Sequence, residues 1–542
     1  MPSMIVCPEP PAARAGQDVF AAGGNAVDAA VAAAFCQGVT NPLLCGVGGT
    51  ALFHYYDAAT RRGVVLNAEV AIGSRPVPSA WREEYVGRAE TVGRYIIRSE
   101  ANQVGHQSVM IPGFVRGCWT AFNRFGSGHL TWAELLAPAI RLAREGFEVY
   151  PYIAAFWRDG VGGDAGDARP GYPGMVTKLT ATPDARRLYF KADGSPFRAG
   201  DRLVQPEYAD TLERLALAGG DDFYTGELAR RILEAFERHA GLFSAADLAD
   251  YAVRDEAPLR ARYRKFDVTS TPPPSSGAQL LQMLQILERF DVKALEHDST
   301  AYVDLFARVQ RATFSDNVRL KGIQAADGPA LAAEVLDGER TDYWVDRILR
   351  GERIVVRGGA VDPGTTHLSA IDDQGNVVSF THSIGSLAGS GVVVPGLGFL
   401  FNNFLGHFNP LHGQPDSIEP GKRLGGGLPS IVLRDGSPYL AIGAPGGSRL
   451  ITSVAQVVVN ALDFDMPMEQ AVSVPRFHSE EEQLVFVEPA FSETIVAELE
   501  SLGNTVERST YMSRVQAVRA TENGERKAGA DPRGGGGVGR WP

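Results

Sequence analysis

The sequence predicts a mixed α/β fold, and three observations lead to this prediction. Several segments of the first 320 residues have the length and apolar periodicity of helices. A glycine-rich turn, Cys45 to Thr50, joins the first helical segment to an apolar and aromatic run of strand length. From Thr365 onward, short β-type runs alternate with Gly, Asn, Asp and Pro turns, which is typical of a sheet.

The first helix is predicted over residues 11–40, with Asn25 and Asp28 near its start and the small side chains of Ala29–Phe35 forming a closely packing face. A strand is expected to follow the glycine turn at Ala51–Tyr56. Further packing helices are predicted over Trp132–Arg144, Gly277–Phe290 and Thr300–Asp316. Residues 150–260 carry no mechanistic signature and are interpreted as scaffold. The predicted strands of the second part are 365–371, 377–384, 397–401, 429–433 and 438–442.

Composition and charge limit the classes of partner. The net charge of -12 comes from scattered acids, and no basic stripe suits a nucleic acid. No apolar stretch approaches the ~20 residues that span a bilayer, and the amino-terminal residues lack a signal-peptide pattern, so a cytoplasmic protein without a membrane segment is expected. The four cysteines lack metal or disulfide spacing, and His367 and His382 lack a third ligand, so no metal site is expected.

Residues 362–383 form a candidate hairpin around a turn at Asp372–Asn376. If the hairpin is symmetric about Gln374, Thr365 faces Ser383, His367 faces Thr381 and Ser369 faces Ser379. Hydroxyl groups then line one face. The Ser383 hydroxyl comes within reach of Thr365 and can orient its hydroxyl or its amine.

Thr365 is the candidate nucleophile. A threonine hydroxyl needs a nearby base, and an amino-terminal threonine supplies one in its own α-amino group, whose pKa is typically ~7.7–8. Gly364 permits unusual dihedral angles and lets the Thr365 hydroxyl approach the Gly364 carbonyl. An N-to-O acyl shift followed by hydrolysis would cut the chain between these two residues and expose the amine.

Gly443-Ala-Pro-Gly-Gly-Ser-Arg449 is the candidate source of an oxyanion hole. Gly446 and Gly447 present adjacent backbone N–H groups, and a helix starting in Leu450–Val459 would add its dipole to them. Each of these signals is weak alone, and the prediction depends on their conjunction.

Motifs in this order make the chain resemble the γ-glutamyltransferases over nearly its whole length. The motifs are Gly23-Gly-Asn-Ala-Val-Asp-Ala-Ala30, Gly46-Val-Gly-Gly49, Ile111-Pro-Gly113, Pro272-Pro-Pro-Ser-Ser-Gly277, Thr365-Thr-His-Leu-Ser369, Asn402-Asn403, Gly421-Lys-Arg423, Pro445-Gly-Gly447 and Ala530-Asp-Pro-Arg533. The resemblance implies a four-layer αββα sandwich of the N-terminal nucleophile (Ntn) hydrolase type. It implies that the precursor cuts itself into a large subunit, 1–364, and a small subunit, 365–542, which share one core without metal or organic cofactor.

The resemblance also implies roles for single residues: Thr365 as nucleophile, Ser383 at the second hydroxyl position, and Gly446 and Gly447 as oxyanion hole. The family's amino-acid clamp is changed at five positions. Gly425 and Gly426 stand in place of two serines, Gly385 in place of an asparagine, and Phe404 and His407 in place of polar and acidic residues after Asn402-Asn403. Arg75 is the candidate match for the carboxylate-binding arginine, or alternatively an ion-pair partner of Glu69.

A site that hydrogen-bonds a zwitterion rejects other molecules because its buried polar groups go unpaired, so loss of those groups favours other acyl donors. The first hypothesis is therefore an autoprocessing amide hydrolase or acyl transferase with altered or broadened acyl specificity, acting on a small-molecule amide. A C–C hydrolase of a biosynthetic pathway and an unprocessed binding scaffold are the alternatives, and a homo-oligomer is left open. Division of 58.1 kDa by residue number predicts fragments of about 39 and 19 kDa.

Overall fold

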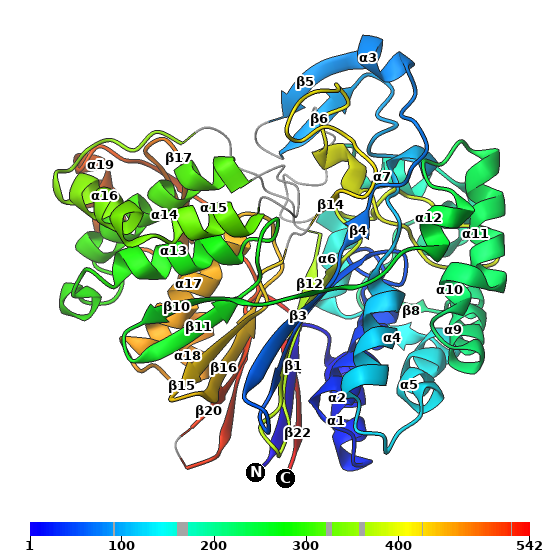
Figure 1. Ribbon diagram of the computed structural model, residues 1–542, viewed down its shortest axis with the longest axis horizontal. Coiled ribbons are helices and arrows are strands. Elements are labelled where there is room, and N and C mark those ends of the chain that lie inside the picture. The colour runs from blue at the N-terminus through cyan, green and yellow to red at the C-terminus, as the bar shows by residue number, and fades with distance from the viewer. Residues whose placement is uncertain (90–92, 160–171, 321–327, 357–363, 425–426, 522) are drawn as a thin grey trace.

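The computed structural model describes residues 1–542 except 90–92, 160–171, 321–327, 357–363, 425–426 and 522. Two antiparallel sheets stack face to face, and each is covered on its outer face by helices (Figure 1). Three separate groups of buried apolar side chains fill the two helix–sheet interfaces and the space between the sheets. The predicted four-layer αββα arrangement is confirmed.

The first sheet has seven strands in the order β22-β1-β12-β13-β2-β3-β9. Its centre is the hairpin β12–β13, bordered by β1 from the amino terminus and by β2 after the glycine turn. Both chain ends lie in this sheet, at the lower edge of Figure 1. The strands are β1 (Ser3–Cys7), β2 (Thr50–Asp57), β3 (Arg62–Ala68), β9 (Arg254–Glu256), β12 (Thr366–Ile371), β13 (Val377–Ser383) and β22 (Gly537–Trp541).

The second sheet has six strands in the order β10-β11-β15-β16-β20-β21. It mixes strands from both sides of the predicted cleavage point, which is why the two predicted subunits share one core. The strands are β10 (Leu259–Tyr263), β11 (Phe266–Ser270), β15 (Ser430–Arg434), β16 (Ser437–Gly443), β20 (Gln516–Ala520) and β21 (Arg526–Ala530).

Two helical layers enclose the sheets (Figure 1). The layer on the first sheet includes α1 (Pro10–Ala21), α2 (Ala26–Thr40), α4 (Phe114–Phe125), α5 (Trp132–Glu145), α9 (Pro206–Ala218) and α11 (Glu227–Arg238). The layer on the second sheet includes α13 (Gly277–Leu287), α14 (Thr300–Leu320), α16 (Gly338–Leu349), α17 (Arg449–Leu462) and α18 (Met468–Ser473). No helix in the described part of the chain has both the length and the apolar character needed to cross a bilayer.

The predicted single helix over 11–40 is wrong, because the structure has two helices there. Gly23 adopts a left-handed φ of +87° and ends the first helix. Asn25 begins the second through a capping box, in which its side chain accepts from the backbone N–H of Asp28 and the Asp28 side chain accepts from that of Asn25. Every residue of α2 is buried, so periodicity could not reveal the break.

The other predicted helices and strands are confirmed within a few residues, with one exception. Residues 397–401 form no strand: Leu400 and Phe401 make only isolated bridges, to Val393 and Gly48. The end of this segment lies between the glycine turn and the loop after β13, where the Phe401 N–H donates to the Val392 carbonyl and the Asn402 N–H to the Gly48 carbonyl.

Candidate active site

The hairpin β12–β13 has the predicted register. His367 pairs with Thr381 and Ser369 with Ser379. Because side chains alternate along a strand, Leu368 and Phe380 face the helical layer, whereas His367 and Ser369 face the second sheet. Thr365 lies two residues before His367, so it is on the same side of the hairpin, which faces the second sheet.

The polar side chains on this face bind one another. Ser369 Oγ donates to the Gln516 carbonyl at 3.0 Å, so His367 Nε2, at 3.1 Å, donates to Ser369. His367 Nδ1 then accepts from the Thr381 hydroxyl at 2.8 Å. Complete burial lowers the pKa of His367 to about 3, so its imidazole is neutral and structural. No group of three or more His, Cys, Asp or Glu side chains among the described residues is arranged to hold a metal ion.

The peptide bond between Gly364 and Thr365 is packed so tightly that only glycine fits at position 364. The Thr365 hydroxyl donates to the Gly364 carbonyl oxygen at 2.6 Å. A Cβ on Gly364 would lie 1.8 Å from the Gly385 carbonyl oxygen. The sequence analysis explained the glycine at position 364 by its conformational freedom, and the structure adds a steric explanation.

Ser383 binds the same carbonyl oxygen. Its hydroxyl accepts the Gly385 N–H at 2.8 Å, which directs its proton toward the carbonyl oxygen of Gly364, to which it donates. From the sequence, Ser383 was predicted to orient the hydroxyl or the amine of Thr365. In the structure it polarises the carbonyl of the bond that Thr365 would attack.

Gly446 and Gly447 lie on the loop that follows β16. Their φ angles are +122° and +61°, in the left-handed region that favours glycine. The predicted helix after them is α17, which begins at Arg449. Gly443, where β16 ends, packs on the ring of His367, because a Cβ there would lie 2.3 Å from Cε1. The loop therefore starts at the same end of the stacked strands as Thr365, which suits the predicted oxyanion role.

A buried network lies beneath Thr366, on the opposite face of the hairpin. The Glu9 carboxylate accepts from Gln37 Nε2 at 2.5 Å, Asn41 Nδ2 at 2.7 Å and the Thr366 hydroxyl at 3.0 Å. Gln37 Oε1 accepts from His382 Nε2 at 2.9 Å. Burial raises the pKa of Glu9. The sequence analysis missed this network, although a lone glutamate between two prolines, directly after an apolar strand, was a signal.

Gly385 stands where the resemblance places an asparagine that binds the substrate amine, and it packs against Asn403, another candidate substrate-binding residue. Gly385 has a φ of +95°, and a Cβ on it would lie 2.4 Å from Asn403 Oδ1. Asn403 accepts the Ser386 N–H at 3.1 Å and donates to the Ser386 hydroxyl at 2.8 Å and to the Gln103 carbonyl at 3.1 Å. Lys178, also missed by the sequence analysis, donates to the same hydroxyl. The amide of Asn403 is thus engaged within the protein.

The remaining predicted binding residues are dispersed. Phe404 is buried in an apolar cluster with Val70 and Ile72. His407 Nδ1 lies 3.3 Å from the Gly93 carbonyl. Arg75 forms an ion pair with Glu237 at 3.1 Å, whereas the buried Glu69 accepts from Ser275 at 2.6 Å and from Asn67 at 3.3 Å, so the alternative pairing of Arg75 with Glu69 is wrong. The substrate role of Arg75 stays a prediction, and Gly425 and Gly426 lie outside the described residues.

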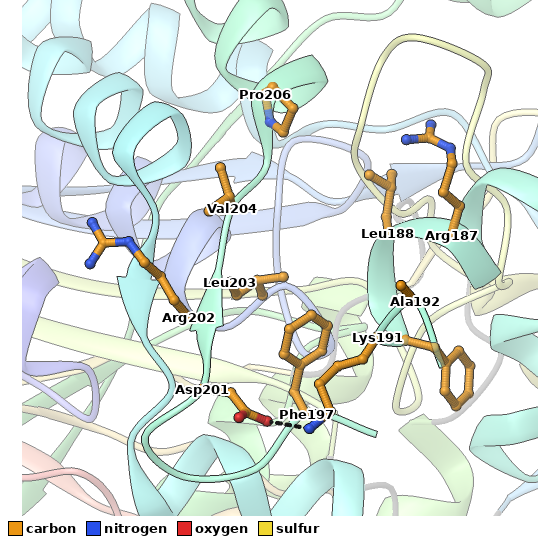
Figure 2. Close-up of a pocket in the computed structure, with 11 residues that line it drawn as sticks. Arg187, Leu188, Lys191, Ala192, Phe197, Asp201, Arg202, Leu203, Val204 and Pro206 are labelled. Carbon is orange, nitrogen blue, oxygen red and sulfur yellow. Dashed lines mark hydrogen bonds and ion pairs between the residues drawn. The ribbon is translucent and has the colours of Figure 1, made fainter. Parts of the chain in front are cut away.

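A separate pocket of about 480 Å³ lies beside α8 (Pro183–Tyr189) and β8 (Arg202–Leu203) (Figure 2). Its lysine, Lys191, pairs with Asp201 at 3.1 Å, and Arg187 pairs with Asp184 and Glu207 at 2.8 and 2.7 Å. None of its lining residues belongs to the hairpin or to the Gly446 loop. It takes no part in the site described above.

The stacked sheets, with a threonine at the start of a central strand, define an Ntn hydrolase. The fold is similar to the crystal structure of cephalosporin acylase from Bacillus halodurans, with a TM-score of 0.85 and 27% identity over 99% of this chain and 95% of that chain. A crystal structure of gamma-glutamyltranspeptidase from Helicobacter pylori aligns over 63% of this chain and 90% of that chain, with a TM-score of 0.52 and 24% identity.

The chain belongs to the gamma-glutamyltranspeptidase family, whose sequence model, described as Gamma-glutamyltranspeptidase, matches residues 12–541. It is 34% identical over 524 residues to acylase ACY 1 proenzyme of Pseudomonas sp. strain SE83, covering 93% of this chain and 87% of the relative. It is 32% identical over 565 residues to glutathione hydrolase proenzyme of Pseudomonas aeruginosa, covering 98% and 93%. The chain is therefore an enzyme of the Ntn hydrolase and acyltransferase class.

Proposed function

We propose that the chain is a self-cleaving acylase or acyl transferase that uses Thr365 as nucleophile and prefers acyl groups other than γ-glutamyl. The observation that carries the proposal is the arrangement at the Gly364–Thr365 bond. Two hydroxyl groups, from Thr365 and Ser383, donate to one carbonyl oxygen in a tightly packed site. When the Thr365 oxygen attacks the carbonyl carbon, the Ser383 hydroxyl remains as the donor that stabilises the negative charge developing on that oxygen.

Self-cleavage begins when the Thr365 oxygen attacks the Gly364 carbonyl carbon. The C–N bond breaks, the Thr365 nitrogen takes up the hydroxyl proton, and an ester joins Gly364 to the Thr365 side chain. Water hydrolyses that ester and releases a Gly364 carboxylate. Thr365 is then an amino-terminal residue with a free hydroxyl and a free amine, the pair that threonine Ntn hydrolases use.

Substrate turnover repeats this chemistry between molecules. The Thr365 amine accepts the hydroxyl proton while the oxygen attacks the substrate carbonyl, and the proton passes to the leaving amine. We assign the stabilisation of the developing oxyanion to the backbone N–H groups of Gly446 and Gly447. Loss of one such donor should raise the activation free energy by ~2.7–4 kcal/mol. Water or an acceptor amine then releases the acyl group from Thr365.

The specificity part of the proposal rests on Gly385 and Asn403. A γ-glutamyl donor carries an α-amine that needs hydrogen-bond partners, yet Gly385 has no side chain and the Asn403 amide is engaged by Ser386 and Gln103. A site without those partners gains little from the amine and leaves it desolvated. Similarity to an acylase ACY 1 proenzyme agrees with this preference.

Three p-nitroanilides isolate the groups involved. γ-Glutamyl and glutaryl anilides differ only in the α-amine, and butyryl anilide also lacks the carboxylate. We expect kcat/KM for the glutaryl or butyryl substrate to equal or exceed that for γ-glutamyl. A γ-glutamyl value at least tenfold above both others would contradict the specificity assignment, and absence of turnover with all three in fully cleaved protein would contradict acyl transfer from an anilide.

A further inference from the structure

A polar cavity of about 380 Å³ lies outside the active site, where α14 meets three loops. The loops follow α16, connect β17 (Phe477–Glu481) to β18 (Leu484–Val487), and connect α19 (Glu493–Ser501) to β19 (Thr505–Arg508). Figure 1 shows α14, α16, α19 and β17 gathered at one side of the molecule. Three arginines and two glutamates contribute to the lining: Arg308, Arg311, Arg353, Glu352 and Glu482.

Arg311 differs from the other two arginines in its partners. Arg308 pairs with Asp304 at 2.8 Å, and Arg353 pairs with Glu482 at 2.6 Å. Arg311 donates only to neutral acceptors, Ser479 Oγ at 3.1 Å and Asn504 Oδ1 at 3.2 Å, and no carboxylate of the described residues lies within ion-pair distance of it. The arginine is 2% exposed.

Burial lowers the pKa of Arg311 to about 10, so the guanidinium remains charged at neutral pH. The carboxylate that acts on Arg311 from a longer distance, Asp304, already pairs with Arg308. A buried charge without a directly bonded counterion is costly, and proteins ordinarily pair it or bind an ion beside it. Arg308 lies three residues earlier, on the same face of α14. The cavity therefore has two neighbouring guanidinium groups, of which one has no carboxylate partner in the described structure.

We propose that this cavity is a binding site for a small hydrophilic oxyanion, held by Arg311 and Arg308. Guanidinium groups bind phosphate and carboxylate through paired N–H donors, which matches this arrangement. The two glutamates do not fill the role, since Glu482 is engaged by Arg353 and Glu352 by Arg347 at 2.7 Å.

The cavity lies between the two predicted subunits, so a bound ligand would have a second effect, which rests on the proposed cleavage. Arg308, Arg311 and residues 351–354 belong to the predicted large subunit, whereas residues 482–505 of the wall belong to the predicted small subunit. A bound oxyanion would join the two fragments after cleavage and stabilise the processed enzyme against dissociation and unfolding.

The test is the thermal midpoint of the full chain titrated with inorganic phosphate, against sodium chloride at equal ionic strength. It is run on the wild type and on Thr365→Ala, which keeps the site in one chain. We expect a saturable rise with phosphate in both proteins. A parallel titration with acetate separates a general carboxylate site, which responds to both anions, from a phosphate site. If phosphate and acetate both behave like chloride, the proposal is wrong, whatever the outcome of self-cleavage.

Variants locate the response. Arg311→Gln should abolish the phosphate-dependent rise, and Arg308→Gln should raise the half-saturating phosphate concentration about tenfold or more. Arg289→Gln is the control, because Arg289 is 49% exposed in its side chain and pairs with Asp342, and neither residue lines the cavity. A full response in Arg311→Gln would overturn the assignment. If Arg311→Gln does not fold, an unchanged half-saturating phosphate concentration in Arg308→Gln would overturn the assignment equally.

Discussion

Ser383 donates its hydroxyl to the carbonyl oxygen of Gly364, the oxygen to which Thr365 also donates. The backbone N–H of Gly385 fixes the direction of that donation. In the proposed mechanism, this relationship prepares the Gly364 carbonyl for attack by the Thr365 oxygen.

Ser383→Ala should slow self-cleavage by about 10²–10³-fold, because removal of one oxyanion donor has an effect of this size. The measurement is a time course of the freshly synthesised precursor on a denaturing gel. Ser379→Ala is the matched control, since Ser379 lies on the same face of β13 and donates to the Ile442 carbonyl at 3.0 Å. Equal cleavage rates in the two variants would remove Ser383 from the mechanism.

Gly364→Ala should also block cleavage, for a steric reason. The added Cβ would lie 1.8 Å from the Gly385 carbonyl oxygen, so the backbone must move, and a displacement of about 1 Å can cost 10²-fold in rate. Gly338→Ala provides the control, because a Cβ at that position meets no atom within 4 Å. Cleavage of Gly364→Ala at the wild-type rate would show that the packing described here is absent during the reaction.

Gly385→Asn should not restore a γ-glutamyl site. Its Cβ would lie 2.4 Å from Asn403 Oδ1, so we expect loss of acyl turnover without any gain on γ-glutamyl anilide. Gly375→Asn separates overlap from backbone strain, because Gly375 has a similar φ of +89° but its Cβ would meet only Ala58, at 3.5 Å. That control should keep its activity, and a rise in γ-glutamyl turnover in Gly385→Asn would contradict the account of the clamp.

Acid should destabilise the fold through His367 and His382. Burial lowers the pKa of both to about 3, whereas an unfolded histidine titrates near 6.5. The unfolded state therefore binds more protons below pH 6.5, and stability falls as the pH drops from 6.5 toward 3. Between pH 6.5 and 5 the loss is about 2 kcal/mol per histidine.

The measurement is urea unfolding of Thr365→Ala, a single chain, at pH 7 and pH 5. Adding His367→Gln should reduce the difference between the two free energies of unfolding by about 2 kcal/mol. Adding His129→Gln, at an exposed position, should leave the difference unchanged. An undiminished difference in the His367 variant would show that this imidazole is not kept neutral by the fold.

Local patterns predicted the hairpin well. The turn at Asp372–Asn376 and the alternation of hydroxyl and apolar side chains fixed the pairing of His367 with Thr381, because a one-residue slip would turn every side chain to the other face. The helix after Gly447 was predicted for a similar reason, since its apolar run follows directly on a glycine pair.

Contacts between distant segments were not predictable in the same way. Glu9 meets Thr366 across 357 residues, and Lys178 meets Ser386 across 208. The sequence around one residue of each pair does not indicate which distant residue it contacts. The break at Gly23 was missed because α2 is buried on all sides, which removes the polar face that would mark a separate helix.

The most direct test of the central claim is the intact mass of the purified wild-type protein together with the amino-terminal sequence of each fragment. The account predicts two fragments of about 39 and 19 kDa, with Thr365 at the start of the smaller one, and a single 58.1 kDa chain for Thr365→Ala. A wild-type chain that stays at 58.1 kDa and still turns over an acyl substrate would contradict it.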